Sequence, residues 1–277
     1  MFAVPCSPPT ALLAASWVHT PHPFLVRFGE NFGIRYYGLG YLLGFAAGVF
    51  LLHWYYRKGR SPLDLGAISD LMSYLVAGVL IGGRVGYFVF YKPQDLFADP
   101  LGLFRVWEGG MASHGGFLGV ILAMWFYARR KQIGFFRLSD MVVSAAPPGL
   151  FVVRIANFLN GELWGKVTDA PWGVIFAQTG GGPLPRHPSQ LYEAALEGLL
   201  LFALMQWRFW KGPTREQPGR VSGEFLLAYA VVRMICEVFR EPDATLILGL
   251  SRGTFYSLFV ALGGLVVIGL SRRRPNP

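Results

Sequence analysis

The sequence predicts an all-α membrane protein, a polytopic bundle of seven transmembrane helices. Of its 277 residues, 53% are hydrophobic and only 15% are charged, whereas ordinary soluble domains carry about 25% charged residues. The mean hydropathy of +0.41 points the same way. Seven apolar stretches are long enough, or nearly so, to cross a hydrocarbon core that needs about 20 helical residues.

The apolar stretches alternate with polar segments along the chain. They are Tyr37–Tyr55, Ile68–Phe90, Gly115–Tyr127, Leu138–Phe158, Leu191–Trp207, Gly223–Phe239 and Thr254–Leu270. Residues 1–18 form an N-terminal extension of unknown role, whose apolar part is too short to span and follows no basic region, so no cleaved signal peptide is predicted. We expect a single membrane domain over residues 19–271 and a cytoplasmic tail over 272–277.

The basic residues of the loops predict the direction of the spans, because loops on the cytoplasmic side carry an excess of Lys and Arg. Four alternate segments hold fourteen basic residues, around Arg57–Arg60, Arg129–Arg137, Arg208–Arg220 and Arg272–Arg274. The opposite side holds eight. The N-terminus is therefore expected outside and the C-terminus in the cytoplasm. Since topology accounts for the net charge of +9, no nucleic-acid partner is expected.

Two outer segments, at about 91–114 and 161–190, are long and rich in Pro, Gly and aromatic residues. Loops of this length in a compact protein are usually functional or disordered. Trp107, Trp164 and Trp172 favour ordered loops lying at the membrane interface, and plain anchoring in the aromatic belt is an equally weighted alternative.

Four ionisable residues lie within the predicted spans: Arg84, Arg154, Arg233 and Glu237. A charge at mid-bilayer costs at least ~2.5–3.5 kcal/mol, so such residues are candidates for the functional site. A structural ion pair or hydrogen bond between helices is the alternative for each of them. At about 1.5 Å of rise per residue, all four fall in the outer half of the membrane, although Pro147-Pro148 is expected to bend the fourth span.

Two further features add to this group. The third span is short, so His114 is expected below the outer surface in a loop that dips inward, which is tolerated only where backbone is buried in protein or lines a cavity. Tyr229, Arg233 and Glu237 are spaced i, i+4, i+8 and share one helix face.

Several arginines at the level of the outer leaflet predict an anion site open to lipid. The anion at that depth is a phospholipid phosphate, which guanidinium groups bind with bidentate, charge-assisted hydrogen bonds. His114 and His187 have no partner His or Cys at metal-ligand spacing, and Cys6 and Cys236 give no metal signature. Cys236 is expected to be a packed thiol. Gly82–Gly86 lies in a span and indicates close helix packing rather than nucleotide binding. No nucleophile elbow surrounds Ser113, which disfavours a serine hydrolase.

Several motifs in order along the chain resemble the bacterial prolipoprotein diacylglyceryl transferases, from about His19 to the C-terminus. They are Ile34–Leu39, Asp99–Trp107, Gly109–Met111, His114–Gly116, Arg154–Gly165, Arg186–Glu193, Arg233–Glu237 and Phe239–Asp243. The sequence departs from the family pattern at Val153 and Ala156, where the family usually has Gly, and at Thr254, where it often has Gln. The first two sites are more crowded, and no role is carried over to Thr254.

The resemblance implies a multi-pass protein of the bacterial inner membrane whose active site faces the outer leaflet, with the N-terminus in the periplasm. It implies that the diacylglyceryl group of phosphatidylglycerol moves to the lipobox cysteine thiol in the signal peptide of a prolipoprotein, with thioether formation and release of glycerol phosphate. The nucleophile belongs to the substrate, and no cofactor or metal is expected. The partners are these two substrates and the surrounding membrane lipids.

Roles for this chain follow as hypotheses. Arg154 and Arg233 bind the phosphate, and Tyr37, Asn157 and Asn160 supply neutral hydrogen bonds. His114 is the first candidate for the base or for orienting the head group, because its ordinary pKa is near 6.5. Glu237 positions Arg233, and Glu162 orients the outer loop. The further candidates for substrate binding are Arg84, His187, Tyr229 and Arg240. A lipid- or anion-binding transporter is the alternative function; it predicts internal repeats and charges at the midplane.

Overall fold

The structure is a computed structural model that describes residues 17–272, apart from 22, 29–32, 106–108, 215 and 243–244, with no side chains described at 96–98. Cys6, Trp107 and most of the predicted N-terminal extension lie outside these residues. The chain divides into two compact units: Met1–Gly48 with Val143–Pro277, and Val49–Val142. The single membrane domain expected over 19–271 stays a prediction.

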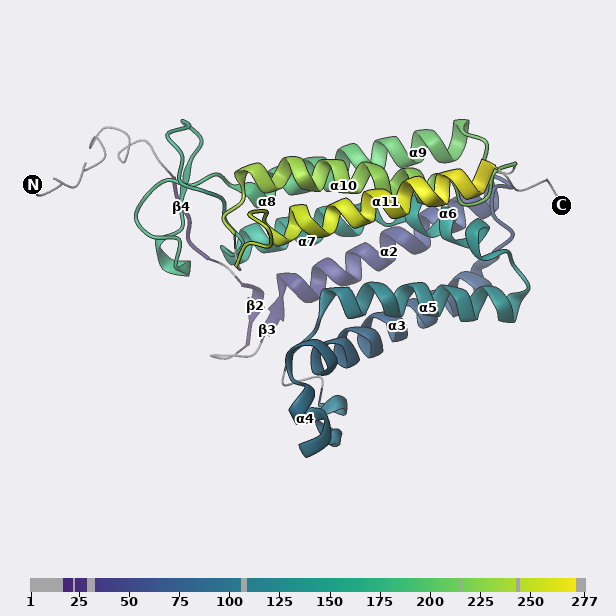
Figure 1. Cartoon of the computed structure of the whole chain (residues 1–277), viewed down its shortest axis with the longest axis horizontal. Helices are drawn as coiled ribbons and strands as arrows, with labels where there is room; N and C mark the ends of the chain where they lie inside the picture. The colour runs from purple at the N-terminus through teal and green to yellow at the C-terminus, as the bar shows by residue number, and fades with distance from the viewer. Residues whose placement is uncertain are drawn as a thin grey trace, which may run out of the picture. The chain divides into compact units, whose positions relative to one another are not determined.

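The first unit holds most of the elements (Figure 1). In chain order they are β1 (Trp17–Val18), β2 (Phe24–Arg27), β3 (Gly33–Arg35), the start of α2 (Tyr36–Arg57), α7 (Pro147–Asn160), β4 (Val174–Ile175), η3 (Ala177–Thr179), α8 (Ser189–Glu193), the π-helix η4 (Ala194–Leu200), α9 (Leu201–Lys211), α10 (Arg220–Phe239) and α11 (Arg252–Arg272). β1 pairs in parallel with β4, and β2 pairs antiparallel with β3.

The second unit is built around two helices, α3 (Leu65–Tyr91) and α5 (Ser113–Lys131). Between them lie α4 (Pro93–Ala98) and the short helix η1 (Pro100–Phe104), and the unit also holds the end of α2 and most of α6 (Phe135–Ala145). Asp64 caps α3, because its carboxylate accepts a hydrogen bond from the Ala67 amide at 2.7 Å.

Glycine brings α3 and α5 into close contact. A Cβ at Gly78 would lie 2.6 Å from the Gly119 carbonyl oxygen, and a Cβ at Gly86 would lie 2.7 Å from Cα of Gly115. Small residues at such spacing let two helix backbones approach within membranes. The interpretation of Gly82–Gly86 as a helix-packing segment is thereby confirmed.

α10 and α11 run side by side in the first unit (Figure 1). A Cβ at Gly223 would lie 2.8 Å from the Gly264 carbonyl oxygen, so this pair also depends on glycine. Where α9 meets α10, the buried Leu201, Met205 and Val221 form a core cluster. Cys236 is fully buried, as expected of a packed thiol.

Among the described residues, three helices are long and apolar enough to cross a membrane: α2, α3 and α11. A fourth span results if α6 and α7, separated at Pro147, count as one broken span. The other predicted stretches lie within α5, α8–η4–α9 and α10. The protein is therefore a helical membrane protein, while the number of seven spans and the direction of the termini stay predictions.

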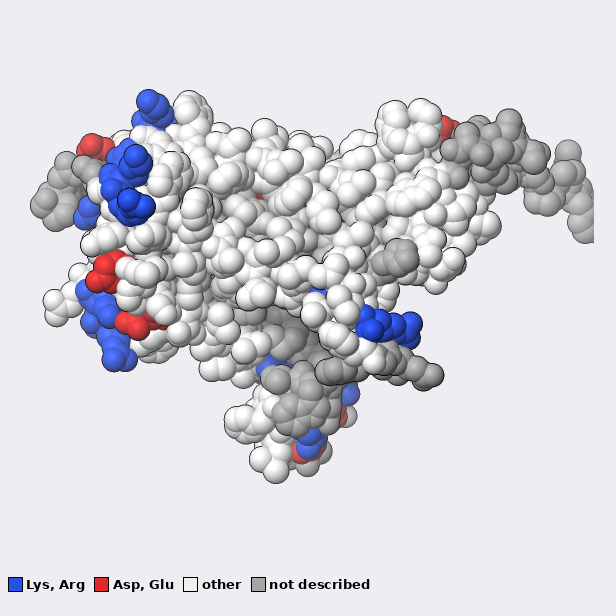
Figure 2. Space-filling model, turned by 180° about the vertical axis from the view of Figure 1, so that it is seen from behind, with Lys and Arg blue, Asp and Glu red and all other residues white. Residues whose placement is uncertain are grey.

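The surface agrees with a lipid environment. Large apolar side chains such as Leu42, Phe50 and Phe259 are 66%, 70% and 60% exposed. On the face drawn in Figure 2, Lys and Arg gather toward the ends of the helices and the flank between them is almost free of charge. Exposing such a flank to water would be unfavourable, so it is suited to hydrocarbon.

Candidate active site

Buried and partly buried charges of both signs meet between α7, α8, η4 and α10 in the first unit. The arginines are Arg154, Arg233 and Arg240, and the carboxylates are Glu193, Glu197 and Glu237. We call these six residues the Arg–Glu cluster. With all six ionised, its three positive and three negative charges cancel.

Each guanidinium of the Arg–Glu cluster contacts more than one carboxylate. Arg154 donates through Nε and Nη2 to Oε2 of Glu197, at 3.0 and 2.9 Å, and its Nη1 lies 3.0 Å from Oε2 of Glu193. Arg233 donates to Glu193 at 2.7 Å, to Glu197 at 3.2 Å and, through Nη2, to Glu237. Arg240 donates to Glu193 at 2.9 Å.

The two central carboxylates are fully buried, since Glu193 and Glu197 have 0% exposed side chains. They are four residues apart across the junction of α8 with the π-helix η4, which keeps both on one face. Gly198 brings that face close to α7, because a Cβ there would lie 2.6 Å from Cβ of Phe151. π-Helical turns occur frequently at functional sites.

A second cluster lies where α7 ends. Oε1 of Glu162 accepts hydrogen bonds from the Tyr37 hydroxyl at 2.5 Å, from Nδ2 of Asn157 at 3.3 Å and from Nδ2 of Asn160 at 3.1 Å. Asn157 Nδ2 also donates to the Tyr37 hydroxyl oxygen. These four residues form what we call the Glu162 cluster.

Local chain chemistry explains how Glu162 reaches this position. Gly161 has a φ of +71° and ends α7 in the left-handed conformation. Its amide bonds to the Phe158 carbonyl at 2.9 Å, and the next amide bonds to the Asn157 carbonyl at 3.1 Å. This is the reversal that a glycine just after a helix permits, and it folds Glu162 back over the last turn of α7.

The 161–190 segment is ordered by contacts within the first unit. Arg186 lies 3.0 Å from Glu241, donates to the carbonyl of Gly165 at 3.0 Å and stacks over Trp164 at 4.3 Å. Lys166 donates to the Val238 carbonyl at 2.8 Å.

His187 lies in an aromatic group at the same end of the unit. Its Nδ1 is 3.1 Å from the Tyr192 hydroxyl, which accepts from Nε1 of Trp172 at 2.7 Å. Burial lowers the pKa of His187, which favours the neutral ring.

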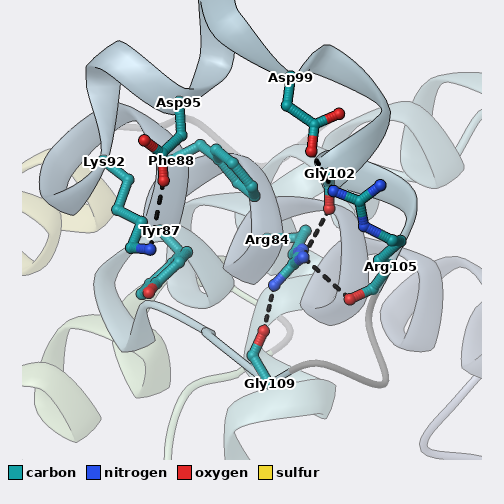
Figure 3. A pocket seen from close by; sticks show the side chains of 9 residues that line it. All are labelled: Arg84, Tyr87, Phe88, Lys92, Asp95, Asp99, Gly102, Arg105 and Gly109. Atoms are coloured by element: carbon teal, nitrogen blue, oxygen red, sulfur yellow. Dashed lines mark hydrogen bonds and ion pairs between the residues drawn. The ribbon is translucent and has the colours of Figure 1, made fainter.

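Arg84 belongs to the second unit and has a different environment (Figure 3). Only 4% exposed, it donates to the backbone carbonyls of Leu103 at 3.3 Å, Gly102 at 2.5 Å, Arg105 at 2.9 Å, Gly110 at 3.2 Å and Gly109. Beside it is a cavity of about 190 Å³. The charged groups that line the cavity include the ion pairs Lys92–Asp95 and Arg105–Asp99. Through its carbonyl contacts, Arg84 holds residues 102–105, 109 and 110 in place.

The structure thus brings together most of the predicted site residues. Arg154, Arg233, Arg240 and Glu237 share the Arg–Glu cluster, and Tyr37, Asn157, Asn160 and Glu162 share the Glu162 cluster. Tyr229 packs against the core cluster and stacks on Phe225 at 6.1 Å, and it lies close enough to Arg154 and Arg233 to interact with them electrostatically.

The prediction that His114 lies in a loop is wrong. It lies in the first turn of α5, which begins at Ser113. The helix extends past the apolar run because Gly115 packs against α3, and hydropathy marks an apolar run rather than the end of a helix.

Sequence reasoning missed Glu193 and Glu197 as site residues. Glu193 is the last residue of the Arg186–Glu193 motif, and Glu197 belongs to none of the motifs. The rule that an ionisable residue within a span marks function applies equally to acids. Both glutamates lie in the apolar stretch Leu191–Trp207, so that signal was present in the sequence.

No group of three or more His, Cys, Asp or Glu side chains that could hold a metal ion occurs within the part of the chain that the structure describes. The site consists of guanidinium, carboxylate, amide and phenol groups. Such groups can bind an oxyanion, orient hydroxyl groups and stabilise charge on a leaving group.

Comparison with known proteins agrees with this chemistry. Residues 23–270 match the family model described as prolipoprotein diacylglyceryl transferase. The chain is 46% identical over 258 residues to the phosphatidylglycerol–prolipoprotein diacylglyceryl transferase of Bordetella avium, a match that covers 92% of this chain and 96% of that protein. It is also 46% identical over 260 residues to the protein of the same name from Idiomarina loihiensis, covering 92% and 95%, and 43% identical over 265 residues to that of Bordetella bronchiseptica, covering 92% and 97%. The chain therefore belongs to the prolipoprotein diacylglyceryl transferase family.

Proposed function

We propose that this protein transfers the diacylglyceryl group of phosphatidylglycerol to the lipobox cysteine thiol of prolipoproteins, in the bacterial inner membrane. The single observation that carries the proposal is the buried Arg–Glu cluster, found in a chain whose relatives bear that activity in their names. Both substrates are held in the membrane, so in this proposal they reach the site laterally from the bilayer, between apolar helices.

The reaction breaks the bond between the diacylglyceryl carbon and a phosphate oxygen and forms a carbon–sulfur bond. The thiol loses its proton, and glycerol phosphate leaves carrying the electrons of the broken bond and takes up a proton. The protein therefore has to stabilise charge on the leaving phosphate and to assist removal of the thiol proton, since a free thiol has a pKa of about 8.5.

Arg154 and Arg233 are the groups that stabilise the leaving phosphate. A guanidinium has five N–H donors, and Arg154 contacts its glutamates through three nitrogens, two of which carry two hydrogens each. The sequence predicted an open anion site, but in the structure Arg154 and Arg233 are already paired with carboxylates. The phosphate uses their remaining N–H groups or displaces a carboxylate, while Glu237 holds Arg233 in position.

His114 stays the first candidate for the base or for orienting the head group, now from the first turn of a helix. The active site faces the outer leaflet in this proposal, and the N-terminus lies in the periplasm. The support is the excess of basic residues in the segments assigned to the cytoplasm.

The test is transfer by purified protein. Incubation with phosphatidylglycerol and a lipobox peptide should raise the peptide mass by one diacylglyceryl group. Arg154→Ala should lower the rate on the order of 10²–10³-fold, as for removal of a donor to a developing oxyanion, and His114→Gln should lower it strongly. Lys58→Ala, an exposed residue outside both clusters, is the control with an unchanged rate.

Two results would contradict the proposal. An unchanged peptide mass with wild-type protein would favour the alternative of a lipid or anion transporter. Near-normal transfer by Arg154→Ala or His114→Gln would remove the role assigned to that residue.

A further inference from the structure

The orientation of the amide groups around Glu162 suggests what this part of the site recognises. One carboxylate oxygen, Oε1, receives three donors: the Tyr37 hydroxyl, Nδ2 of Asn157 and Nδ2 of Asn160. An ionised carboxylate accepts hydrogen bonds and cannot donate them. Both asparagines must therefore turn their NH₂ groups toward Glu162.

The same constraint fixes the direction of the amide oxygens. In a planar amide the oxygen lies on the other branch from the nitrogen, so Oδ1 of each asparagine points away from Glu162. Tyr37 adds no donor elsewhere, because its proton goes to Glu162 and its oxygen accepts from Asn157. The donors of the Glu162 cluster converge on its carboxylate, and the two amide oxygens point away from that carboxylate.

A third amide repeats this arrangement. Gln190 is fully buried, and its Nε2 donates at 2.6 Å to the backbone carbonyl of Glu162. Within the described residues, the amide oxygens of Asn157, Asn160 and Gln190 are all buried and have no hydrogen-bond partner. Asn157 is itself only 2% exposed. Native proteins rarely leave buried acceptors unpaired, because each one costs free energy.

We infer that these three amide oxygens form the acceptor set for the two hydroxyl groups of the phosphatidylglycerol head group, with Glu162 as the positioning residue that holds the asparagine amides in the accepting orientation. The inference rests on the proposed function. Asn157 follows Arg154 by three residues on α7, so the two side chains are neighbours on one helix face. A phosphate bound by Arg154 carries its glycerol group toward these acceptors.

This changes the role first expected for the asparagines. Phosphate oxygens are acceptors, so they cannot bond to amide oxygens, and the Nδ2 groups are already engaged by Glu162 and Tyr37. Hydroxyl groups are the donors that the arrangement fits. Backbone N–H groups of the bound peptide are the other donors present in the reaction, and the experiment separates the two sources.

The main arm is a lipid series with the same acyl chains and phosphate. Phosphatidylglycerol carries two head-group hydroxyls, phosphatidyl-1,3-propanediol one and phosphatidylpropanol none. With wild-type protein, we expect transfer to fall on the order of 10- to 100-fold from the first lipid to the last, because a site built to bond a hydroxyl rejects an analogue without it. Equal rates for all three lipids would overturn the inference without any variant.

The second arm tests Glu162 itself. A glutamine at this position can present NH₂ as well as oxygen, so Glu162→Gln releases the asparagine amides to turn. We expect the ratio of the transfer rates from phosphatidylglycerol and phosphatidylpropanol, and the ratio of their binding, to shrink at least about fivefold. Glu241→Gln, a matched change in the segment that follows α10, should keep the wild-type preference. An undiminished preference in Glu162→Gln would remove the positioning role.

A third arm addresses the peptide as the source of donors. Methylating the backbone nitrogens on either side of the peptide cysteine removes their hydrogen atoms. The assignment to glycerol is wrong if three results occur together: methylation slows transfer by the wild-type protein, it does not slow transfer by Glu162→Gln, and the lipid series shows no preference. The amide oxygens would then bind the peptide.

Binding distinguishes failure of this inference from failure of the proposed function. Native mass spectrometry of the full chain in detergent compares bound phosphatidylglycerol with bound phosphatidylpropanol. A binding preference without any transfer would contradict the proposed function and leave the head-group assignment standing. Transfer without any preference in rate or binding would contradict the head-group assignment and leave the proposed function standing.

Discussion

Two buried arginine sites of this protein differ in what satisfies the guanidinium groups. Arg84, in the second unit, donates to five backbone carbonyls of the 102–110 segment. Arg154 and Arg233, in the first unit, contact the side-chain carboxylates of Glu193, Glu197 and Glu237. Both sites obey the rule that a buried charge is paired or hydrogen-bonded.

The difference lies in what a ligand could displace. Backbone carbonyls belong to the fold, and an anion cannot take their place without unfolding the segment. Carboxylate side chains can rotate away and carry a charge that an incoming phosphate replaces. An arginine within a predicted span therefore marks a functional candidate chiefly when side chains are its partners, and Arg84 is better explained as a structural group.

The largest expected effect is on the Arg–Glu cluster, at Glu193. Arg154, Arg233 and Arg240 all contact this carboxylate, so Glu193→Ala leaves buried positive charge without its counterion. We expect the free energy of unfolding to fall by about 3–5 kcal/mol, measured as a loss of thermal stability in detergent.

Glu193→Gln serves as its control, because it removes the charge and keeps a hydrogen-bond acceptor, and it should cost less than Glu193→Ala. A thermal midpoint unchanged by Glu193→Ala would mean that the three arginines have other counterions, and the comparison with Arg84 would lose its basis.

The next effect is expected in the second unit. Arg84→Lys keeps the charge but cannot reach all of the carbonyls, so we expect a loss of about 2–3 kcal/mol from the acceptors left unpaired. Hydrogen exchange should rise in residues 99–105 and stay unchanged in α7.

The two arginine sites should also differ in their effect on transfer. In Arg84→Lys, the rate of transfer per folded molecule should fall less than about tenfold, whereas in Arg154→Lys it should fall more than about 100-fold. Equal losses for the two variants would show that Arg84 belongs to the active site.

Much of the fold could be predicted from the sequence. The helices follow the apolar stretches, the glycines of α3 pack against α5, and Pro147 begins α7 after a break. These features depend on local chemistry. The start of α5 could not be predicted, since packing against α3 rather than hydropathy determines it.

The sequence predicted which residues belong to the candidate site better than it predicted which of them contact each other. Arg154, Arg233 and Glu237 stood out as charges in apolar runs, and the Gly161 reversal brings Asn157 and Glu162 together within a few residues. The contact of Arg154 with Glu197 joins residues 43 apart. This contact depends on the π-helix η4 and on the close approach of Gly198 to α7. Neither feature could be predicted from a periodicity in the sequence.

The smallest expected effect concerns how the Arg–Glu cluster is held from α11. A Cβ at Gly253 would clash with the carboxylate of Glu237, the partner of Arg233. Gly253→Ala should therefore displace Glu237 and cost about 1–2 kcal/mol of unfolding free energy. Gly263→Ala, on the same helix, meets no atom within 4 Å and is the matched control. Because Glu237 holds Arg233 in position, the transfer rate should also fall in Gly253→Ala. It should recover in part in the double variant with Glu237→Asp, whose side chain is shorter. Equal stability and transfer in the two alanine variants would show that Arg233 does not need Glu237, and only the central glutamates would remain as its counterions.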